Sequence, residues 1–331
     1  ERFKSGRYRA PAVRRVHIPK PGKAKKTRPI GITTLEDKVL QRAVLMALEP
    51  VYEQDFLDCS YVFRPGRSAH QELDALWRGL MAMGGGWIID LDIQSFFDDV
   101  DWGHLRSFLD RRVRDGVIRR AIGKWLNAGV MESGEVSHPD RGTPQGGVIS
   151  PALSNLYLHE LLEVWYEHVV KPRLLGRAFE IRFADDAALV FELEEDARRV
   201  LAVLSKRFAK YGLHLHQQNT RLVDFRSPPR AGWGGSQRER SFGLLGFTHY
   251  WGRSRKGRWV VQRKTAKDRF TRALREVGGW CRAHRHWPVA AQQAALHRKL
   301  KGDYAYYGIT GNGRALACFL YVVRHLWRKW L

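Results

Sequence analysis

Residues 182–191 read RFADDAALVF and place two adjacent aspartates, Asp185 and Asp186, between apolar runs rich in strand-forming residues. Adjacent carboxylates repel each other, and burying them in a sheet costs free energy unless a partner compensates for their charge. The pattern predicts two strands joined by a tight turn that presents both acids at its tip. Such a placement is favourable when the acids hold something positively charged.

A second predicted strand also carries acids. Residues 87–93, WIIDLDI, alternate so that the aliphatic side chains point to one face and Asp90 and Asp92 to the other. Carboxylates are the hard oxygen ligands that Mg²⁺ prefers, and two ions ~3.5–4 Å apart can activate a hydroxyl and stabilise a leaving pyrophosphate. A solvated acidic turn would also explain a lone Asp-Asp pair, and spacing alone does not separate Asp90 from Asp92.

The charge balance indicates the class of partner. The chain of 331 residues has 57 Lys and Arg against 34 Asp and Glu, which gives a net charge of +23. This excess favours polyanions, so we expect nucleic acid as the partner, ahead of a ribosomal-type structural role. A membrane partner is not expected, because we find neither a long uncharged apolar stretch nor a signal peptide. Three scattered cysteines argue against a disulfide framework or a zinc site and favour a reduced intracellular compartment.

The rest of the chain reads as a mixture of strands and helices. Thr33 and Glu36 form a capping box that predicts a helix ending near residues 49–50. A glycine-rich loop that contains Gln145 runs into an apolar helix. We expect further helices around 102–128, 150–170 and 194–211, a linker at 226–241, a short buried strand at 242–247, and basic helices at the end. This organisation predicts an α+β body with a helical appendage.

Taken in order, these segments resemble the palm motifs of reverse transcriptases: LDIQSFFDDV, RGTPQGGVISP, RFADDAALVF and FGLLGF. The segments RPIGITTLEDKVLQRAVLMALEPVYE and SYVFRPGRSAHQEL resemble the finger motifs of the group II intron type, and YAYYGITGN with VVRHLWRKWL resembles its thumb, the maturase X region. The resemblance implies an α+β fold with right-hand polymerase architecture. Its fingers would span residues 1–86 with parts of 102–140, its palm 87–250, and its linker strand and helical thumb 251–331.

The resemblance also assigns roles to individual residues. It implies that Asp92, rather than Asp90, joins Asp185 and Asp186 as a catalytic carboxylate that holds two Mg²⁺ ions, with Mn²⁺ as a substitute. The family's metal site also takes in the position of Ile93. The implied nucleotide-binding residues are Arg28 and Lys23 for the triphosphate, Phe97 as the steric gate that selects deoxynucleotides, and Gln145. The implied template and primer residues are Arg64, Arg67, Phe183, Leu245 and Gly246, where Arg64 and Arg67 belong either to template binding or to finger architecture.

Two departures from the family pattern bear on this site. The usual tyrosine before the acidic pair is Phe183, which keeps the ring and loses a hydroxyl, and we expect polymerisation to survive that change. The lysine that the family uses to protonate the departing pyrophosphate is Asn219, which cannot donate a proton in that way. Asn219 therefore leaves the proton donor open.

The resemblance predicts an RNA-directed DNA polymerase of the group II intron type. Its expected partners are an RNA template, a DNA or RNA primer, dNTPs and structured intron RNA, without a membrane, in the cytoplasm of a prokaryotic cell or in an organelle. One alternative is an RNA-binding maturase with secondary or lost polymerase activity. Another is a domesticated reverse transcriptase in phage defence, CRISPR spacer acquisition or DNA repair. The oligomeric state stays open.

Overall fold

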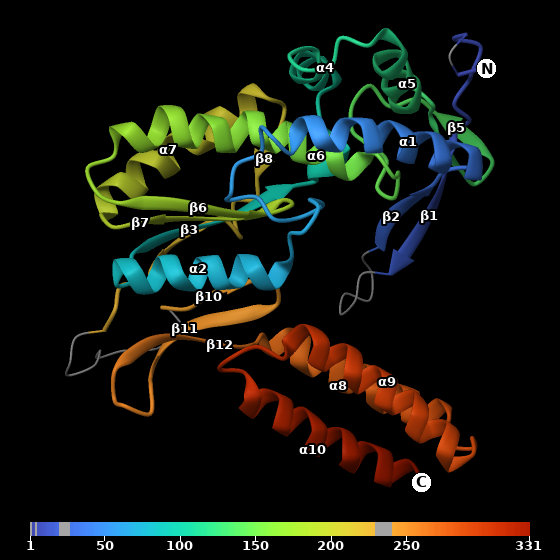
Figure 1. Cartoon of the computed structure of the whole chain (residues 1–331). Helices are drawn as coiled ribbons and strands as arrows, with labels where there is room; N and C mark the ends of the chain where they lie inside the picture. The colour runs from blue at the N-terminus through green and yellow to red at the C-terminus, as the bar shows by residue number, and fades with distance from the viewer. Residues whose placement is uncertain (1, 4, 20–26, 229–239) are drawn as a thin grey trace. The chain divides into compact units, whose positions relative to one another are not determined.

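A five-stranded sheet carries both acidic segments at its centre (Figure 1). Its middle strand is β3 (Trp87–Gln94), which pairs antiparallel with β7 (Asp186–Phe191), and β7 pairs antiparallel with the edge strand β6 (Ala178–Phe183). On the other side β3 pairs with β8 (His214–Leu215) and β9 (Arg221–Asp224). The two strands predicted around the acidic pair are confirmed, and β3 confirms the predicted alternating strand.

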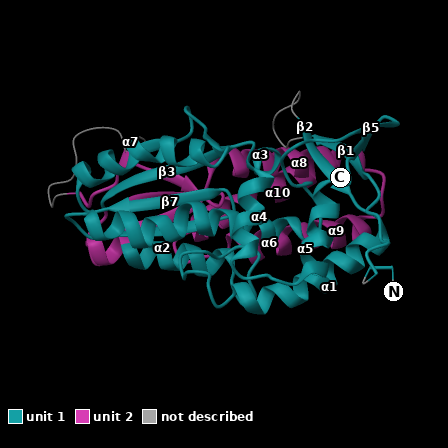
Figure 2. Cartoon of the chain, turned by 90° about the horizontal axis from the view of Figure 1, so that it is seen from above, with its two compact units in different colours: residues 1–79, 86–222 teal, residues 80–85, 223–331 magenta. Residues whose placement is uncertain are grey.

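The chain divides into two compact units, which Figure 2 distinguishes by colour. The computed structural model describes residues 2–3, 5–19, 27–228 and 240–331. Unit 1 contains Glu1–Gly79 and Gly86–Leu222, and unit 2 contains Leu80–Gly85 and Val223–Leu331. Most of the segments expected as fingers and most of the expected palm belong to unit 1, whereas Leu80–Gly85 belongs to unit 2. The division into fingers, palm and thumb stays a prediction.

Helices cover both faces of the sheet because its strands alternate between two apolar faces (Figure 1). Helix α2 (Ala69–Met83) packs on one face, where the ring of Phe179 fills the space left by Gly79. The opposite face packs against α6 (Ser150–Leu158) and α7 (Glu194–Lys210). The two faces of the sheet are therefore covered by helices.

The remaining part of unit 1 contains a four-stranded sheet in the order β2-β1-β4-β5 and further helices. The strands are β1 (Val13–Pro19), β2 (Thr27–Ile32), β4 (Val130–Glu132) and β5 (Glu135–Ser137). The helices are α1 (Leu35–Tyr52), α3 (Phe96–Asp99), α4 (Trp102–Asp110) and α5 (Gly116–Leu126).

The structure corrects three helix predictions. Helix α1 is capped by Thr34, whose side chain accepts from the backbone N–H of Asp37, rather than by Thr33. The helix also continues past Pro50 to Tyr52. The segment 102–128 forms two helices, because Asp115 caps a new one. The segment 150–170 continues beyond α6 as two π-helical stretches, His159–Glu163 and Tyr166–Val170.

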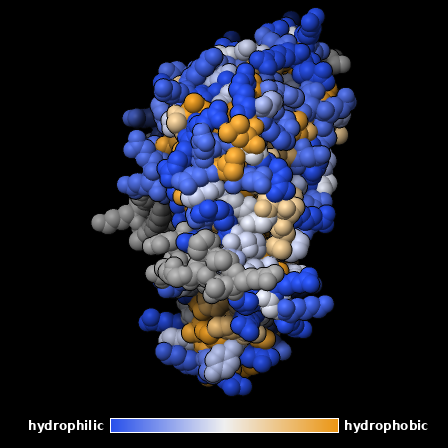
Figure 3. Space-filling view, turned by 90° about the vertical axis from the view of Figure 1, so that its left-hand side faces the viewer, coloured by the Kyte–Doolittle hydropathy of each residue, from blue (hydrophilic) through white to orange (hydrophobic). Residues whose placement is uncertain are grey.

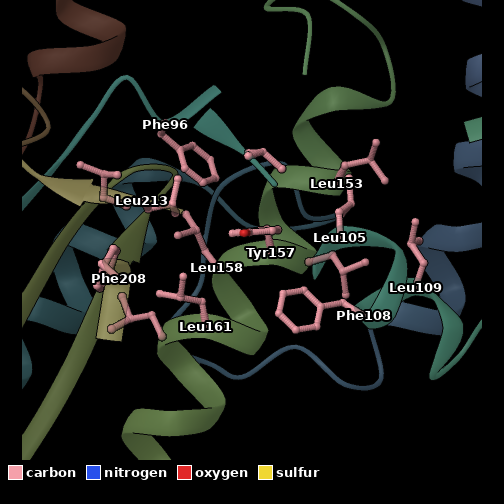
Figure 4. Packing of buried hydrophobic residues seen from close by; sticks show 14 of the residues in the cluster. Phe96, Leu105, Phe108, Leu109, Leu153, Tyr157, Leu158, Leu161, Phe208 and Leu213 are labelled. Carbon is pink, nitrogen blue, oxygen red and sulfur yellow. The ribbon is translucent and has the colours of Figure 1, made fainter. Parts of the chain in front are cut away.

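One hydrophobic core in unit 1 joins its helices to the central sheet. Figure 4 shows Phe96, Leu158 and Leu213 among the side chains that pack there. Phe96 is 2% exposed, and Leu158 and Leu213 are fully buried. The aliphatic residues of β3 that were predicted to share one face are part of the same core.

Unit 2 combines a small sheet with three helices. The sheet consists of β10 (Phe242–Leu244), β11 (Phe247–Arg253) and β12 (Trp259–Thr265). The helices are α8 (Lys267–Ala283), α9 (Val289–Tyr307) and α10 (Gly313–Trp330), and they pack around Val277, Cys281, Leu296, Phe319 and Val323. The prediction of a single strand at 242–247 is wrong. Leu245 and Gly246 adopt positive φ and turn the chain between β10 and β11. Most of the expected linker 226–241 lies outside the described residues.

Hydrophilic residues dominate the molecular face in Figure 3, and hydrophobic residues are scattered over it in patches. Every helix in the described part of the chain is too short or too polar to cross a membrane.

Glu72 of α2 is a buried acid without compensation. Its side chain is inaccessible to solvent, and neither carboxyl oxygen has a hydrogen-bond partner among the described residues. Burial raises its pKa from the ordinary value of 4.5 to about 9, Arg182 opposes the rise, and Asp186 adds to it. At neutral pH the folded chain therefore holds this carboxyl protonated.

Substitution of Glu72 by glutamine should reduce the decrease in the free energy of unfolding that the wild type shows as the pH rises towards 9. The folded state keeps a proton that the unfolded state loses above pH 4.5, so the wild type loses stability as the pH rises towards 9. The loss approaches about 1.4 kcal/mol per pH unit. Urea unfolding at pH 6, 7, 8 and 9 measures it, with the exposed Glu195→Gln as the control whose slope stays that of the wild type. Equal slopes for Glu72→Gln and the wild type would contradict the prediction.

Candidate active site

The register of the central sheet brings the acidic segments together. Asp92 of β3 is the cross-strand partner of Asp186 on β7, and Asp185 lies next to it in the turn between β6 and β7. Cross-strand partners point to the same face of a sheet, with Cβ atoms about 5 Å apart. Three carboxylates from two segments that are distant in the sequence thus lie at one end of the sheet.

The turn that carries Asp185 has an uncommon backbone. Ala184 adopts a φ of +56°, in the left-handed region that residues other than glycine rarely occupy. Such conformations cost of order 1–3 kcal/mol and persist only where the surroundings impose them. Here the two-residue connection between Phe183 and Asp186 itself requires a positive φ at its first position.

The electrostatic environment of Asp185 reflects the crowding of negative charge. Burial raises the pKa of this carboxyl above its ordinary value, and the charge of Asp92 adds to the rise. The guanidinium groups of Arg28 and Arg182 oppose it. A bound cation would act in the same direction as the arginines, because it favours the ionised carboxylate.

The structure separates Asp92 from Asp90, which share a strand face. Asp90 lies opposite Ala188 and pairs with Arg221, whose Nε lies 3.3 Å from Asp90 Oδ2. Asp92 lies at the acidic end of the strand, opposite Asp186. The geometry favours Asp92 as the acid that works with the hairpin.

Asn219 contacts this acid directly. Its Nδ2 donates to Asp92 Oδ2 at 2.5 Å, and the backbone N–H of His216 donates to the Asp92 carbonyl at 2.8 Å. Because the amide of Asn219 is neutral, it does not compensate the charge of Asp92, but its hydrogen bond orients the Asp92 carboxylate. A neutral donor at this position leaves the charge of Asp92 available to a cation.

The donor set fits Mg²⁺ by its chemistry. Mg²⁺ is usually held by one or two carboxylates together with water and substrate phosphates. Among the described residues no three His, Cys, Asp or Glu side chains form a ready-made metal cluster, so Asp92 and Asp185 would need such additional oxygens. The buried side chain of Ile93 belongs to the core, so only its main-chain carbonyl could contribute.

Phe97 and Gln145 line a common cavity of about 320 Å³, together with Arg15, His17 and Arg141. The glycine-rich loop approaches closely here: the backbone N–H of Thr143 donates to the Phe97 carbonyl at 2.7 Å. At Gly142, with φ +87°, a Cβ would lie 2.6 Å from the carbonyl oxygen of Asp98. Only glycine fits this approach.

The triphosphate residues lie elsewhere. Pro29 and Gly31 of β2 line the cavity, so the alternation of the strand directs Arg28 to the opposite face. Arg28 is exposed and acts electrostatically on Asp185. Lys23 lies outside the described residues.

Arg64 has an architectural environment. Its guanidinium is 3% exposed and donates to the Glu53 carboxylate and to the carbonyl oxygens of Leu57 and Ser60. Of the two roles left open for Arg64, these contacts favour finger architecture. Arg67 pairs with Asp58 at 2.5 Å and remains partly exposed. A template contact by Arg64 or Arg67 stays a prediction.

The remaining template and primer residues belong to two places. Phe183, which is half-buried, ends β6 opposite Asp186. Leu245 and Gly246 form a turn in unit 2, where the hydroxyl of Tyr306 donates to the Leu245 carbonyl at 2.8 Å. Their roles towards a primer stay predictions.

Arg182, in the motif RFADDAALVF, was not predicted to contribute to the site. Arg182 is buried beneath the hairpin and donates to the carbonyl of Ala184 at 3.0 Å. The signals that could have identified it were a cation between the apolar residues Ile181 and Phe183, and the acid Glu163 next to Leu162.

Comparison with known proteins identifies the family. Residues 18–249 match the reverse transcriptase (RNA-dependent DNA polymerase) family. The chain belongs to the reverse transcriptases. This result confirms the resemblance inferred from the motifs, and reverse transcriptases in general use divalent metal ions.

Curated relatives of this reverse transcriptase include proteins encoded by group II introns. The chain is 41% identical to group II intron-encoded protein LtrA of Lactococcus lactis over 159 residues, which cover 48% of this chain and 26% of LtrA. It is also 41% identical to protein YkfC of Escherichia coli over 172 residues, which cover 51% of this chain and 45% of YkfC. The chain thus spans less than half the length of these relatives.

Solved structures support the fold. The telomerase of Candida albicans, in complex with a fragment of telomeric RNA, matches 99% of this chain with a TM-score of 0.55 and 13% identity, and the match covers 61% of the telomerase chain. Together with the mixture of helices and antiparallel sheets, this likeness confirms the predicted α+β fold class.

Proposed function

We propose that the chain is an RNA-directed DNA polymerase of the group II intron type. It would transfer a nucleotide from a dNTP to a primer 3′-OH on an RNA template. The observation that carries the proposal is the register of β3 and β7, which sets Asp92 opposite Asp186 and beside Asp185. Family membership and the relatives encoded by introns support it.

The residues of the chain would divide the work as follows. Asp92, Asp185 and Asp186 would hold two Mg²⁺ ions, or Mn²⁺ in their place. The ions, when bound, would lower the pKa of the primer hydroxyl and stabilise charge on the leaving pyrophosphate. Asn219 would orient Asp92, and Arg28 would attract the triphosphate. Phe97 would crowd a ribose 2′-OH at the edge of the cavity that it shares with Gln145.

The partners follow from charge. A net charge of +23 supports non-specific binding of a template–primer duplex through its phosphates, which weakens steeply as salt rises. We also propose binding of structured intron RNA, which would aid splicing and retrohoming, in the cytoplasm of a prokaryotic cell.

A maturase without significant polymerase activity is the second candidate. Asn219 favours it, because the family lysine that would protonate pyrophosphate is absent there. A further relative, nuclear intron maturase 2 of Arabidopsis thaliana, is 35% identical over 107 residues, which cover 31% of this chain and 14% of that protein. A domesticated role in phage defence, spacer acquisition or repair would use the same catalytic residues.

Primer extension tests the proposal. The purified chain, an RNA template with an annealed DNA primer, dNTPs and Mg²⁺ should give full-length cDNA, and the Asp185→Asn variant should give none above background. Binding of a group II intron RNA without extension by the wild type would instead support the maturase. Extension by Asp185→Asn at the wild-type rate would contradict the polymerase proposal.

A further inference from the structure

Arg182 is the largest fully buried side chain of the described residues and lies directly before the catalytic turn. Its residue is 1% exposed. Its guanidinium makes five contacts with four acceptor atoms: Glu163 Oε1 from Nε at 2.6 Å and from Nη2 at 2.5 Å, Asn155 Oδ1 at 3.2 Å, the Ala184 carbonyl at 3.0 Å and Ser60 Oγ at 2.6 Å. One cation thus joins the turn to three other segments of unit 1.

The backbone of Arg182 strengthens the connection to one of these segments. Its N–H donates to the Cys59 carbonyl at 2.8 Å, and its carbonyl accepts from the Tyr61 N–H at 3.2 Å. Residues 59–61 therefore run along the free edge of β6 as a short parallel bridge. The segment SYVFRPGRS, expected to belong to the fingers, holds the hairpin from outside.

The charge of Arg182 is matched by Glu163, which is fully buried. Burial alone would raise the pKa of Glu163, but Arg182 and the hydrogen bond from His159 hold it below the ordinary value. Glu163 ends the π-helical stretch His159–Glu163, and its other oxygen Oε2 lies 2.8 Å from His159 Nδ1. Such π-helical turns frequently mark functional sites.

An ion pair with Glu163 does not by itself explain why residue 182 is an arginine. A lysine could neutralise Glu163, but its ammonium is a point charge without the planar fork of donors. In Arg182, one edge of the fork faces Glu163 while Nη1 faces the Ala184 carbonyl. This carbonyl belongs to Ala184, the residue with φ +56° at the first position of the turn.

We propose that Arg182 is a positioning residue, which fixes the strained turn through the Ala184 carbonyl and so places Asp185 beside Asp92. The proposal rests on the proposed polymerase function for its catalytic consequence, but its structural part does not. Ser60, Asn155 and Glu163 hold the guanidinium in place, and Arg182 acts on the chemistry only through Asp185.

The experiment compares Arg182→Lys with Arg207→Lys in the full chain. Arg207 donates to two carbonyls of the same π-helical region, those of Glu160 and Leu161, and its guanidinium lies over the rings of Trp165 and Tyr211 rather than against the hairpin. Hydrogen exchange by mass spectrometry should show amides 183–186 exchanging at least about tenfold faster in Arg182→Lys and unchanged in Arg207→Lys. Ser60→Ala removes one acceptor of the guanidinium and should accelerate the exchange of the same amides by a smaller factor. This variant tests the proposal if Arg182→Lys does not fold.

Steady-state kinetics separate positioning from simple destabilisation. After titration of active sites, Arg182→Lys should lower kcat at least about tenfold, with an unchanged Kd for template–primer. Unchanged exchange at 183–186 in both Arg182→Lys and Ser60→Ala would overturn the proposal, and so would a normal kcat per active site. If the wild type extends no primer, the polymerase function fails, while the exchange data still judge the role of Arg182 in the turn.

Discussion

Asp92→Asn should lower dNTP incorporation on an RNA template by at least about a hundredfold, because it removes a charge that would hold the metal ions. The asparagine keeps the shape of the side chain and its place opposite Asp186. Single-turnover primer extension at saturating dNTP and Mg²⁺ measures the loss.

The matched control is Asp90→Asn, on the same strand face two residues earlier. Asp90 lies opposite Ala188 and pairs with Arg221, away from the turn. We expect the Asp90→Asn variant to retain the wild-type rate within about fivefold, because the substitution removes a partly exposed ion pair and not a metal ligand. Equal losses for the two variants would contradict the assignment of Asp92, and retention of more than about a hundredth of the rate by Asp92→Asn would remove the metal role from it.

Phe97→Ala should raise the use of ribonucleotides relative to deoxynucleotides by about tenfold or more. A clash with the 2′-OH that costs about 1–3 kcal/mol changes the selectivity by a factor of this order. Phe97 is half-buried and lines the cavity that also contains Gln145. The ratio of kcat/KM for matched dNTP and rNTP measures the selectivity.

The neighbouring ring is the control. Phe96 is 2% exposed and packs in the core of unit 1 (Figure 4). Phe96→Leu should lower thermal stability and leave the sugar selectivity unchanged. An unchanged ratio in Phe97→Ala, or an equal change in both variants, would remove Phe97 from the role of a steric gate.

Local pattern predicted the elements that carry the site. The strand period of two identified 87–93 and the strands around the acidic pair, because each strand has one face in the core. The same logic was less successful where a turn interrupts an apolar run. FGLLGF contains no polar residue at the turn, so the positive φ values of Leu245 and Gly246 had no clear signal in the sequence.

The motifs also predicted which acids matter but not how they are supported. Spacing could not separate Asp90 from Asp92, and the missing lysine at Asn219 indicated only a lost proton donor. In the folded chain Asn219 instead donates to Asp92, 127 residues away in the sequence. Arg64, expected either at the template or within the fingers, is enclosed by acceptors of its own loop.

The sequence by itself determined the family and the α+β class and predicted the three acidic residues, because these depend on short-range periodicity and on an ordered set of motifs. Only the tertiary structure decided which neighbours Asp92, Phe97 and Arg182 have, because hydrogen bonds and burial depend on segments far apart along the chain. Arg182 and Ser60, 122 residues apart, illustrate this: neither residue alone indicates that the other holds it in place.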